Sequence, residues 1–377
     1  MRTLAALTMI AAGAAGCAVI LGIDEKPLAE AAEAGVDAGD RCVPHRPPPP
    51  TDVNDDDVTR APFYVATRSY GFDGNLGFDL DDACTYGDAS PTCLSRVRRV
   101  DQDGGVDNAL GQSGFIQALQ AAGIENENIA CGRSTLVVVI EGYNGRANDT
   151  NVLFGPVLSS GIQTPHDGSD LPSECNGKDD AGLPTVYAAK WDGTDQWNID
   201  PPFVQKGETT PIRRLQGYVR EWVLVAEAPP DLLLPIPIGP AVVDIAQVKV
   251  VATLTPLDAE RKPLPLSRET RASFLRIDKA EMAGRISRDA FFRGLHVTYS
   301  SRYGFICPNN LAYPAAKSVV CDGLDLMALP SKDGRSENCD AVSAAASFVA
   351  EPVGVVGGRT PAVSVASPCA DAPTTCP

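Results

Sequence analysis

Thr135-Leu136-Val137-Val138-Val139-Ile140, followed after Glu141 by Gly142-Tyr143-Asn144-Gly145, is the stretch that decides the fold. The run is apolar and rich in β-branched side chains, and the Gly/Asn cluster behind it is a turn signal, so it predicts a strand. Similar runs recur at residues 63–67, 151–158, 184–189, 218–226, 242–254, 295–300 and 343–350. Clusters of Pro, Gly, Asn and Asp separate them, which favours antiparallel sheets over βαβ units.

Two segments carry helix signals. The first, 114–122, follows Ser113 as its cap, and the second, about 279–293, begins with the capping-box residues Asp278 and Glu281. Strand runs nevertheless dominate the chain. The sequence therefore predicts a mainly β fold: an antiparallel β-sandwich-like domain with one or two short helices, stapled by disulfides.

The N-terminus carries a secretory pattern. Arg2 supplies a positive charge, residues 4–15 are almost wholly small and apolar, and Ala14-Ala15-Gly16 leads directly into Cys17. A cysteine at this place resembles the bacterial lipoprotein signal, which implies cleavage after residue 16 and lipidation of Cys17. Ala14 stands where that signal usually has Leu. Ala12-Gly13-Ala14 also fits an ordinary secretory cleavage site, which would release a soluble protein.

The cysteine count favours lipidation over release. The chain has eleven cysteines, and an odd number leaves a free thiol in an exported protein. If Cys17 carries lipid, the even remainder can pair completely, and Cys84–Cys93 is an expected local disulfide. Residue Ala18 is not the Asp that typically retains bacterial lipoproteins in the inner membrane. The resemblance therefore implies an outer-membrane anchor.

Composition divides the chain into segments of different character: a signal peptide at 1–16, a disordered Ala/Asp/Pro-rich tether at 17–60, an acidic Cys-containing subregion at 61–132, a β-rich domain at 133–352 and a Gly/Pro/Ala-rich tail at 353–377. The tether lacks the apolar area that would offset the entropy of ordering it. Cys369 and Cys376 are expected to pin the tail. The apolar stretch 232–254 contains prolines, Asp244 and Lys249, so it is not expected to span a membrane.

The net charge of −16 argues against nucleic acid as a partner.

A calcium site is the strongest candidate site in the sequence. Residues 101–108 place carboxylates around a Gly-permitted turn, as oxygen-ligated calcium requires; this spacing resembles part of the acidic loops of thrombospondin type 3 repeats. The candidate ligands are Asp101, Asp103, Asp107 and Asn108. The acidic stretch Asp79-Leu80-Asp81-Asp82 completes such a site if disulfides fold the two stretches together; the alternative for both is a solvated surface turn.

A glycan contact is the second candidate. Residues 191–197 hold two of the three tryptophans in a polar, turn-rich stretch. Exposed rings beside carboxylates are suited to stacking on sugars, so the candidate ligands are Trp191, Asp192, Asp195 and Trp197. The alternative is a packing role in the core or at its rim.

Catalytic motifs are largely missing from the sequence. The three histidines lack metal-ligand spacing, and no nucleophile elbow, P-loop or Cys-x-x-Cys occurs. The leading hypothesis is a lipid-anchored bacterial cell-envelope protein with a non-catalytic binding or structural domain, whose partners are the membrane and a glycan, calcium or another envelope protein. The alternative is a glycoside hydrolase using Glu141 and Glu221 as paired carboxylates. Residues 339–343 and 105–108 resemble uncharacterised bacterial lipoproteins, which implies no activity.

Overall fold

The computed structural model describes the chain in segments: residues 46–51, 61–82, 92–95, 106–121, 124–163, 188–205, 209–238, 241–300, 304–310, 313–334, 337–357 and 367–376. All of them belong to one compact unit, which begins at Arg41. Cys17, Asp101 and Asp103 lie outside the described residues, as do the expected signal peptide and most of the expected tether.

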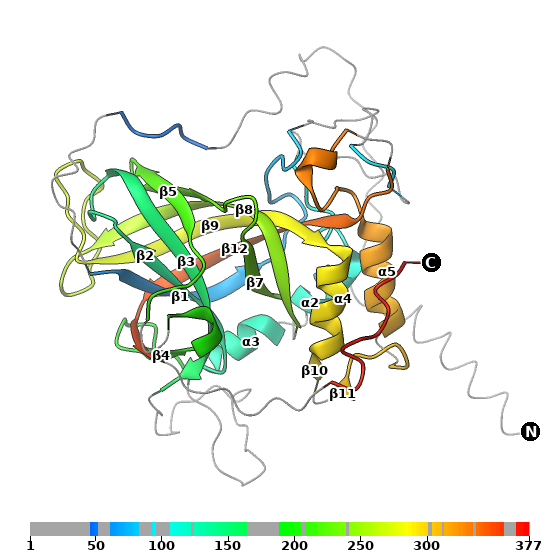
Figure 1. The fold of residues 1–377 in the computed structure, drawn as a ribbon. Coiled ribbons are helices and arrows are strands. Elements are labelled where there is room, and N and C mark those ends of the chain that lie inside the picture. The colour runs from blue at the N-terminus through cyan, green and yellow to red at the C-terminus, as the bar shows by residue number, and fades with distance from the viewer. Residues whose placement is uncertain are drawn as a thin grey trace, which may run out of the picture. The chain divides into compact units, whose positions relative to one another are not determined.

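The centre of this unit is one antiparallel sheet that closes on itself (Figure 1). The strands of the closed sheet are β1 (Phe63–Gly71), β2 (Thr135–Glu141), β3 (Asn148–Ile162), β5 (Leu215–Arg220), β6 (Val223–Glu227), β8 (Ala241–Leu257), β9 (Phe274–Ser287) and β12 (Ala341–Pro352). The neighbours run β3-β2-β1-β12-β9-β8-β6-β5, and β5 pairs again with β3. The expected mainly antiparallel β fold is confirmed, and its strands form one continuous sheet.

Side chains fill the interior of the closed sheet. Strand β2 contributes Leu136, Val138 and Ile140 to this core, and β3 contributes Val152 and Phe154. The other strands supply further buried residues, among them Phe63, Val65, Leu215, Leu224, Val250, Leu254, Ile277, Met282 and Phe348. Between the β-bulges every second residue faces inward, as the two-residue period of a strand requires.

Beyond β3 the sheet continues into a second layer, which covers the outer face of β1, β2 and β3. It contains β4 (Gln196–Ile199) and β13 (Gly354–Gly357), which pair in parallel. Val137 and Val139 of β2 face this layer and pack with Trp197. Strand β2 is therefore buried on both faces, which explains why its sequence is apolar throughout instead of alternating.

The helices lie beside the closed sheet (Figure 1). They are α2 (Gly114–Ala121), α3 (Ile124–Ala130), α4 (Arg288–Val297) and α5 (Tyr313–Gly323), with the 3₁₀ turns Pro201–Phe203 and Pro330–Lys332. The short strands β7 (Leu233–Ile238), β10 (Tyr299–Ser300) and β11 (Gly304–Phe305) complete the described elements. The helix expected at 114–122 is confirmed, and the Ser113 hydroxyl accepts the Ile116 N–H at 3.3 Å. Among the described residues, no helix is both long and apolar enough to cross a membrane.

Three expected elements differ in the structure. The segment expected as a helix at 279–293 is mostly β9, and α4 starts only at Arg288, with the Ser287 hydroxyl accepting the Ala290 N–H. The expected strand 218–226 is a hairpin that turns at Glu221 and Trp222. The expected strand 295–300 is the end of α4 followed by the two residues of β10. For β9, pairing with β8 and β12 overrides the local helix preference.

Disulfides join segments that are far apart in the sequence. Cys93 pairs with Cys339, Cys307 with Cys369, and Cys321 with Cys376. The expected Cys84–Cys93 pair is wrong, because Cys93 bonds a residue 246 positions away. The expected pinning of the tail through Cys369 and Cys376 is confirmed. Of the expected strand 184–189, residues 184–187 lie outside the described part, and the rest is not in a strand.

Candidate metal centre

Three aspartates from two separate segments meet on the outer side of the closed sheet. Asp79 and Asp81 follow β1, and Asp107 precedes α2. One carboxylate oxygen from each lies within 4.8 Å of the other two. We call these residues the acidic triad.

Backbone pairing brings the two segments together. Phe78 and Asp107 form an antiparallel bridge in which the Asp107 N–H donates to the Phe78 carbonyl at 3.1 Å. The Asp107 carboxylate in turn accepts the Leu80 N–H at 2.7 Å. Gly77 makes this approach possible: its φ is +133°, and an added Cβ would lie 3.0 Å from the Asp107 carbonyl oxygen. Backbone hydrogen bonds therefore hold the two segments together without requiring a disulfide.

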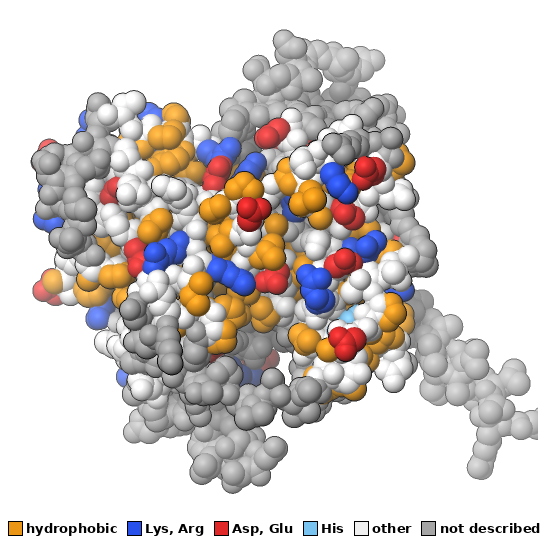
Figure 2. All heavy atoms as spheres, in the orientation of Figure 1, with side chains coloured by type: hydrophobic (Ala, Val, Ile, Leu, Met, Phe, Trp, Pro, Cys, Tyr) orange, Lys and Arg blue, Asp and Glu red, His pale blue; other side chains and the backbone are white. Residues whose placement is uncertain are grey.

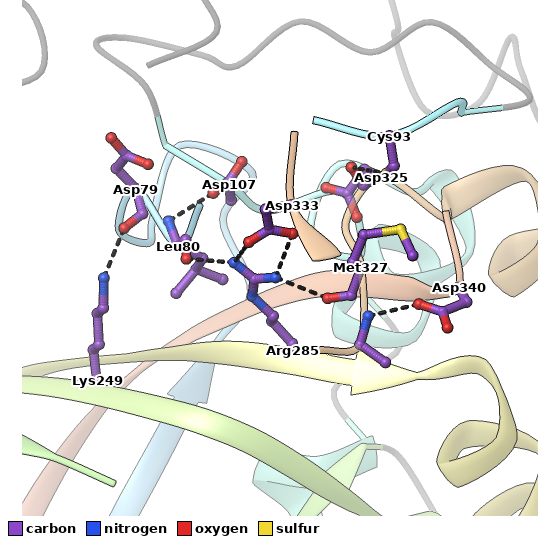
Figure 3. A network of polar contacts seen from close by, with 11 residues as sticks. Asp79, Leu80, Cys93, Asp107, Lys249, Arg285, Asp325, Met327, Asp333 and Asp340 are labelled. Atoms are coloured by element: carbon purple, nitrogen blue, oxygen red, sulfur yellow. Dashed lines mark hydrogen bonds and ion pairs between the residues drawn. The ribbon is translucent and has the colours of Figure 1, made fainter. Parts of the chain in front are cut away.

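Two cations on the outer face of the sheet hold the segment after β1 (Figure 3). Lys249 of β8 donates from Nζ to the Asp79 carbonyl at 2.8 Å. Arg285 of β9 donates from Nη2 to the Leu80 carbonyl at 2.6 Å, and both of its Nη atoms bind Asp333. The Arg285 side chain is 1% exposed. Its charge is thus matched by Asp333, outside the acidic triad.

The carboxylates of the triad repel one another. Burial, the hydrogen bond to Asp81 and the charges of Asp81 and Asp82 together raise the pKa of Asp79 to about 6. Asp79 Oδ1 is buried and accepts no hydrogen bond within the described part of the chain. Burial also lowers the pKa of Lys249. Nearby positive charge would relieve this repulsion.

The spacing of the triad fits a divalent cation. Calcium binds oxygen at about 2.3–2.6 Å, so two oxygens on one ion are separated by at most about 5 Å. The separations within the triad stay below that limit. Hard carboxylate ligands suit calcium or magnesium, and the absence of His or Cys from the triad disfavours zinc.

Of the ligands predicted in residues 101–108, only Asp107 belongs to the triad. Asn108 is 1% exposed, and its Oδ1 accepts the N–H groups of Gly111 and Ala345 at 3.0 and 2.9 Å. Because its amide joins the segment to β12, Asn108 is not a ligand in this arrangement, and that prediction is corrected. The sequence made the meeting of the two acidic stretches conditional on disulfides; in the structure, the stretch that starts at Asp79 meets Asp107 through the backbone bridge.

The predicted glycan residues lie mostly inside the protein. Trp197 is fully buried, and its ring centroid is 5.7 Å from that of the half-buried Trp191. Asp195 is also buried and accepts the backbone N–H groups of Lys190 and Trp191. An inaccessible ring cannot stack on a sugar, so the predicted ligand roles of Trp197 and Asp195 are corrected to packing and turn formation. Only Trp191 and the exposed Asp192 remain accessible to a glycan.

The two glutamates of the hydrolase alternative are far apart along the sheet. Glu141 pairs with Leu153, which pairs with Gln216 of β5, whereas Glu221 lies five residues farther along, after the last residue of β5. At about 3.3 Å per residue this is about 17 Å, beyond the roughly 5–9.5 Å between glycosidase carboxylates. Glu141 also pairs with Arg214 at 2.8 Å. The glutamates therefore do not form a catalytic pair.

Comparisons with known proteins add no assignment. No protein-family model, curated protein or solved structure matches this chain.

On the face shown in Figure 2, acidic, basic and hydrophobic side chains are interspersed. The function must therefore be inferred from the fold and the acidic triad.

Proposed function

We propose that this protein is a lipid-anchored bacterial cell-envelope protein whose closed β domain is a non-catalytic binding or structural module that binds calcium at Asp79, Asp81 and Asp107. The acidic triad is the observation that carries the calcium assignment. The signal pattern ending at Cys17 supports the anchor. Ala18 after the cysteine supports the outer membrane as its location.

Calcium at the triad would act on the layer over the sheet. The triad joins the segment after β1 to the segment before α2. The first segment packs on β9 and β12 through Phe78 and Leu80, and the second is hydrogen-bonded to β12 at Ala345. An ion that binds the folded arrangement and not the unfolded chain stabilises the protein by mass action. We infer a structural ion, one that holds the acidic segments in register.

Thermal unfolding with calcium and with EDTA tests the metal site. Calcium should raise the Tm of the wild-type protein, and Asp79→Asn should remove most of that increase, because it removes one negative charge and replaces a carboxylate ligand by a weaker amide at nearly constant volume. Asp231→Asn, which changes an exposed aspartate near β7, is the matched control and should retain the full response. A wild-type Tm that does not depend on calcium contradicts the assignment.

Palmitate labelling in cells tests the anchor separately. Label should enter the wild-type protein and not Cys17→Ala, and the labelled protein should fractionate with the outer membrane. Release of unlabelled wild-type protein would instead support the ordinary secretory cleavage site. The calcium result is unaffected by either outcome, since the domain is the same.

A further inference from the structure

A proline-rich strap, which is not part of the segments that form the acidic triad, lies against the sheet. We use this name for Arg46–Thr51, which contain Pro47, Pro48, Pro49 and Pro50 and lie over the outer face of β5 and β6. Pro50 is buried. The composition of the segment predicted a disordered tether, whereas the structure places this part of it in contact with the domain.

Three polar contacts hold the strap. The Tyr218 hydroxyl donates to the Pro47 carbonyl, Arg220 Nη1 donates to the Pro48 carbonyl at 3.1 Å, and Arg46 pairs with Glu227. Tyr218 and Arg220 are neighbours on one face of β5, because alternate residues of a strand share a face. The sheet therefore offers donors to consecutive proline carbonyls and an acid to the arginine that precedes them.

Prolines explain why the contacts have this form. A proline run has no backbone N–H, so it cannot extend the sheet as another strand; it adopts an extended helix whose carbonyls stay free to accept. Domains that bind proline-rich peptides use an aromatic-lined groove for this conformation. Here Tyr218 supplies the aromatic ring and the hydroxyl donor, and Glu227 recognises the adjoining Arg46.

The register of the strands builds the groove. Tyr218 pairs with Val225, and Gln216 pairs with Glu227, so two rows cross from β5 to β6 on the outer face. Val225 is 2% exposed and forms the apolar floor. With the strap in place, an open space of about 380 Å³ remains between the strap and this face. The strap therefore fills the groove only in part.

We propose that this groove is a binding site for proline-rich segments of the Arg-Pro-Pro type, and that the chain's own strap occupies it in cis as a built-in competitor. The contacts lie at the surface: the side chains of Arg46 and Glu227 are 30% and 48% exposed. Exposed ion pairs contribute little to stability, so the strap is releasable. A covalently connected strap still excludes a free peptide up to an effective concentration in about the millimolar range. The groove thus takes a peptide in trans only when the strap is displaced.

The test measures binding of a peptide to the full chain by fluorescence anisotropy. The probe is a fluorescein-labelled peptide with the sequence of Val43–Thr51, and the control probe has its prolines replaced by serine. An open variant carries Arg46→Ala and glycine at each proline from 47 to 50. The probe should bind this variant at least about tenfold tighter than wild type, because the competitor in cis is lost.

Variants of the groove show whether this binding occurs at the proposed site. Tyr218→Phe, made in the open variant, should weaken probe binding at least about fivefold, a loss typical of one hydrogen bond. Glu227→Gln, made in the same variant, should weaken it about twofold, because the ion pair that it removes is exposed. Tyr64→Phe and Glu269→Gln are the matched controls, since they remove a hydroxyl and a charge elsewhere, and should bind like the open variant. Failure of the open variant to bind the probe, equal binding by Tyr218→Phe, or wild type binding as tightly as the open variant each overturns the proposal.

A second measurement does not depend on the peptide. The chain has nine tyrosines, so the ¹⁹F spectrum of protein labelled with 3-fluorotyrosine is simple, and Tyr218→Phe assigns its resonance. Replacing the strap prolines by glycine should shift the Tyr218 resonance and leave that of Tyr64 in place. An unchanged Tyr218 resonance shows that the strap does not occupy the groove and rejects cis occupancy.

Discussion

Arg285 binds both carboxylate oxygens of Asp333, at 2.9 Å from Nη1 and 2.6 Å from Nη2, across a sequence separation of 48 residues. Its guanidinium also donates to the carbonyls of Met327 and Leu80. One buried side chain on β9 therefore holds two covering segments against the sheet. Arginine suits this place because its planar donors match a carboxylate and still reach two carbonyls.

Asp333→Asn should destabilise the protein strongly. The substitution leaves the buried Arg285 charge without its counterion, and breaking a buried pair costs about 3–5 kcal/mol. Urea unfolding measures the loss. Asp322→Asn is the control, because that carboxylate accepts only a surface hydrogen bond from Ser318, and it should cost less than about 0.5 kcal/mol. Equal losses for the two variants would show that the pair does not support the fold.

The stability of the calcium-free protein should depend on Asp79 in mildly acidic solution. Its pKa is raised from 3.8 to about 6, so between these values the folded state binds more protons than the unfolded chain. Stability contributed by protonated Asp79 is therefore present at low pH and is lost as pH rises from about 4 to 6. Chemical unfolding in EDTA should show this loss in wild type relative to Asp79→Asn. A difference between the two that is constant over this range would contradict the raised pKa.

Trp197→Ala should destabilise the protein far more than Trp191→Ala. Trp197 lies on β4 and is fully buried against the outer face of β2. Removal of a large buried side chain costs about 3–5 kcal/mol. Trp191 is only half-buried, so a smaller loss is expected for its removal. Guanidinium unfolding compares the two variants. Comparable losses would mean that the layer around β4 does not pack as described.

Removing the Cys93–Cys339 disulfide should loosen the contact between residues 92–95 and 337–340, which the bond joins. The bond connects residues 246 positions apart, and loss of a native disulfide from a small secreted domain typically costs about 2–5 kcal/mol. The double variant Cys93→Ala/Cys339→Ala should unfold at a lower temperature and retain the contacts of α4. Cys321→Ala/Cys376→Ala is the comparison, since that pair fastens the tail to α5. The calcium response proposed for wild type should be retained in this comparison variant.

Several elements follow from local sequence alone. The run from Leu136 to Ile140 forms β2, and Ser113 begins α2, because strand preference and helix capping depend on neighbouring residues. The helix predicted at 279–293 is wrong for the opposite reason. Its capping-box pattern favours a helix, but pairing with β8 and β12 along nearly its whole length decides for a strand.

The hairpin at Glu221 and Trp222 shows what a local pattern cannot reveal. Both residues have positive φ, 49° and 67°, without the Asn or Gly that usually marks such a turn. Distant contacts hold it: the Trp222 N–H donates to the Ala147 carbonyl, and the Trp222 carbonyl accepts the Leu254 N–H. A run that reads as one strand therefore becomes two.

The sequence by itself determined that the chain forms antiparallel strands with few helices, and its acidic stretches predicted an oxygen-ligated cation. The tertiary structure alone decided that β3 and β5 pair to close the sheet, that Asp79 meets Asp107, and that Tyr218 binds the proline strap. The difference is physical: strand and turn preferences act over a few residues, whereas these contacts join segments whose proximity depends on the packing of the whole domain.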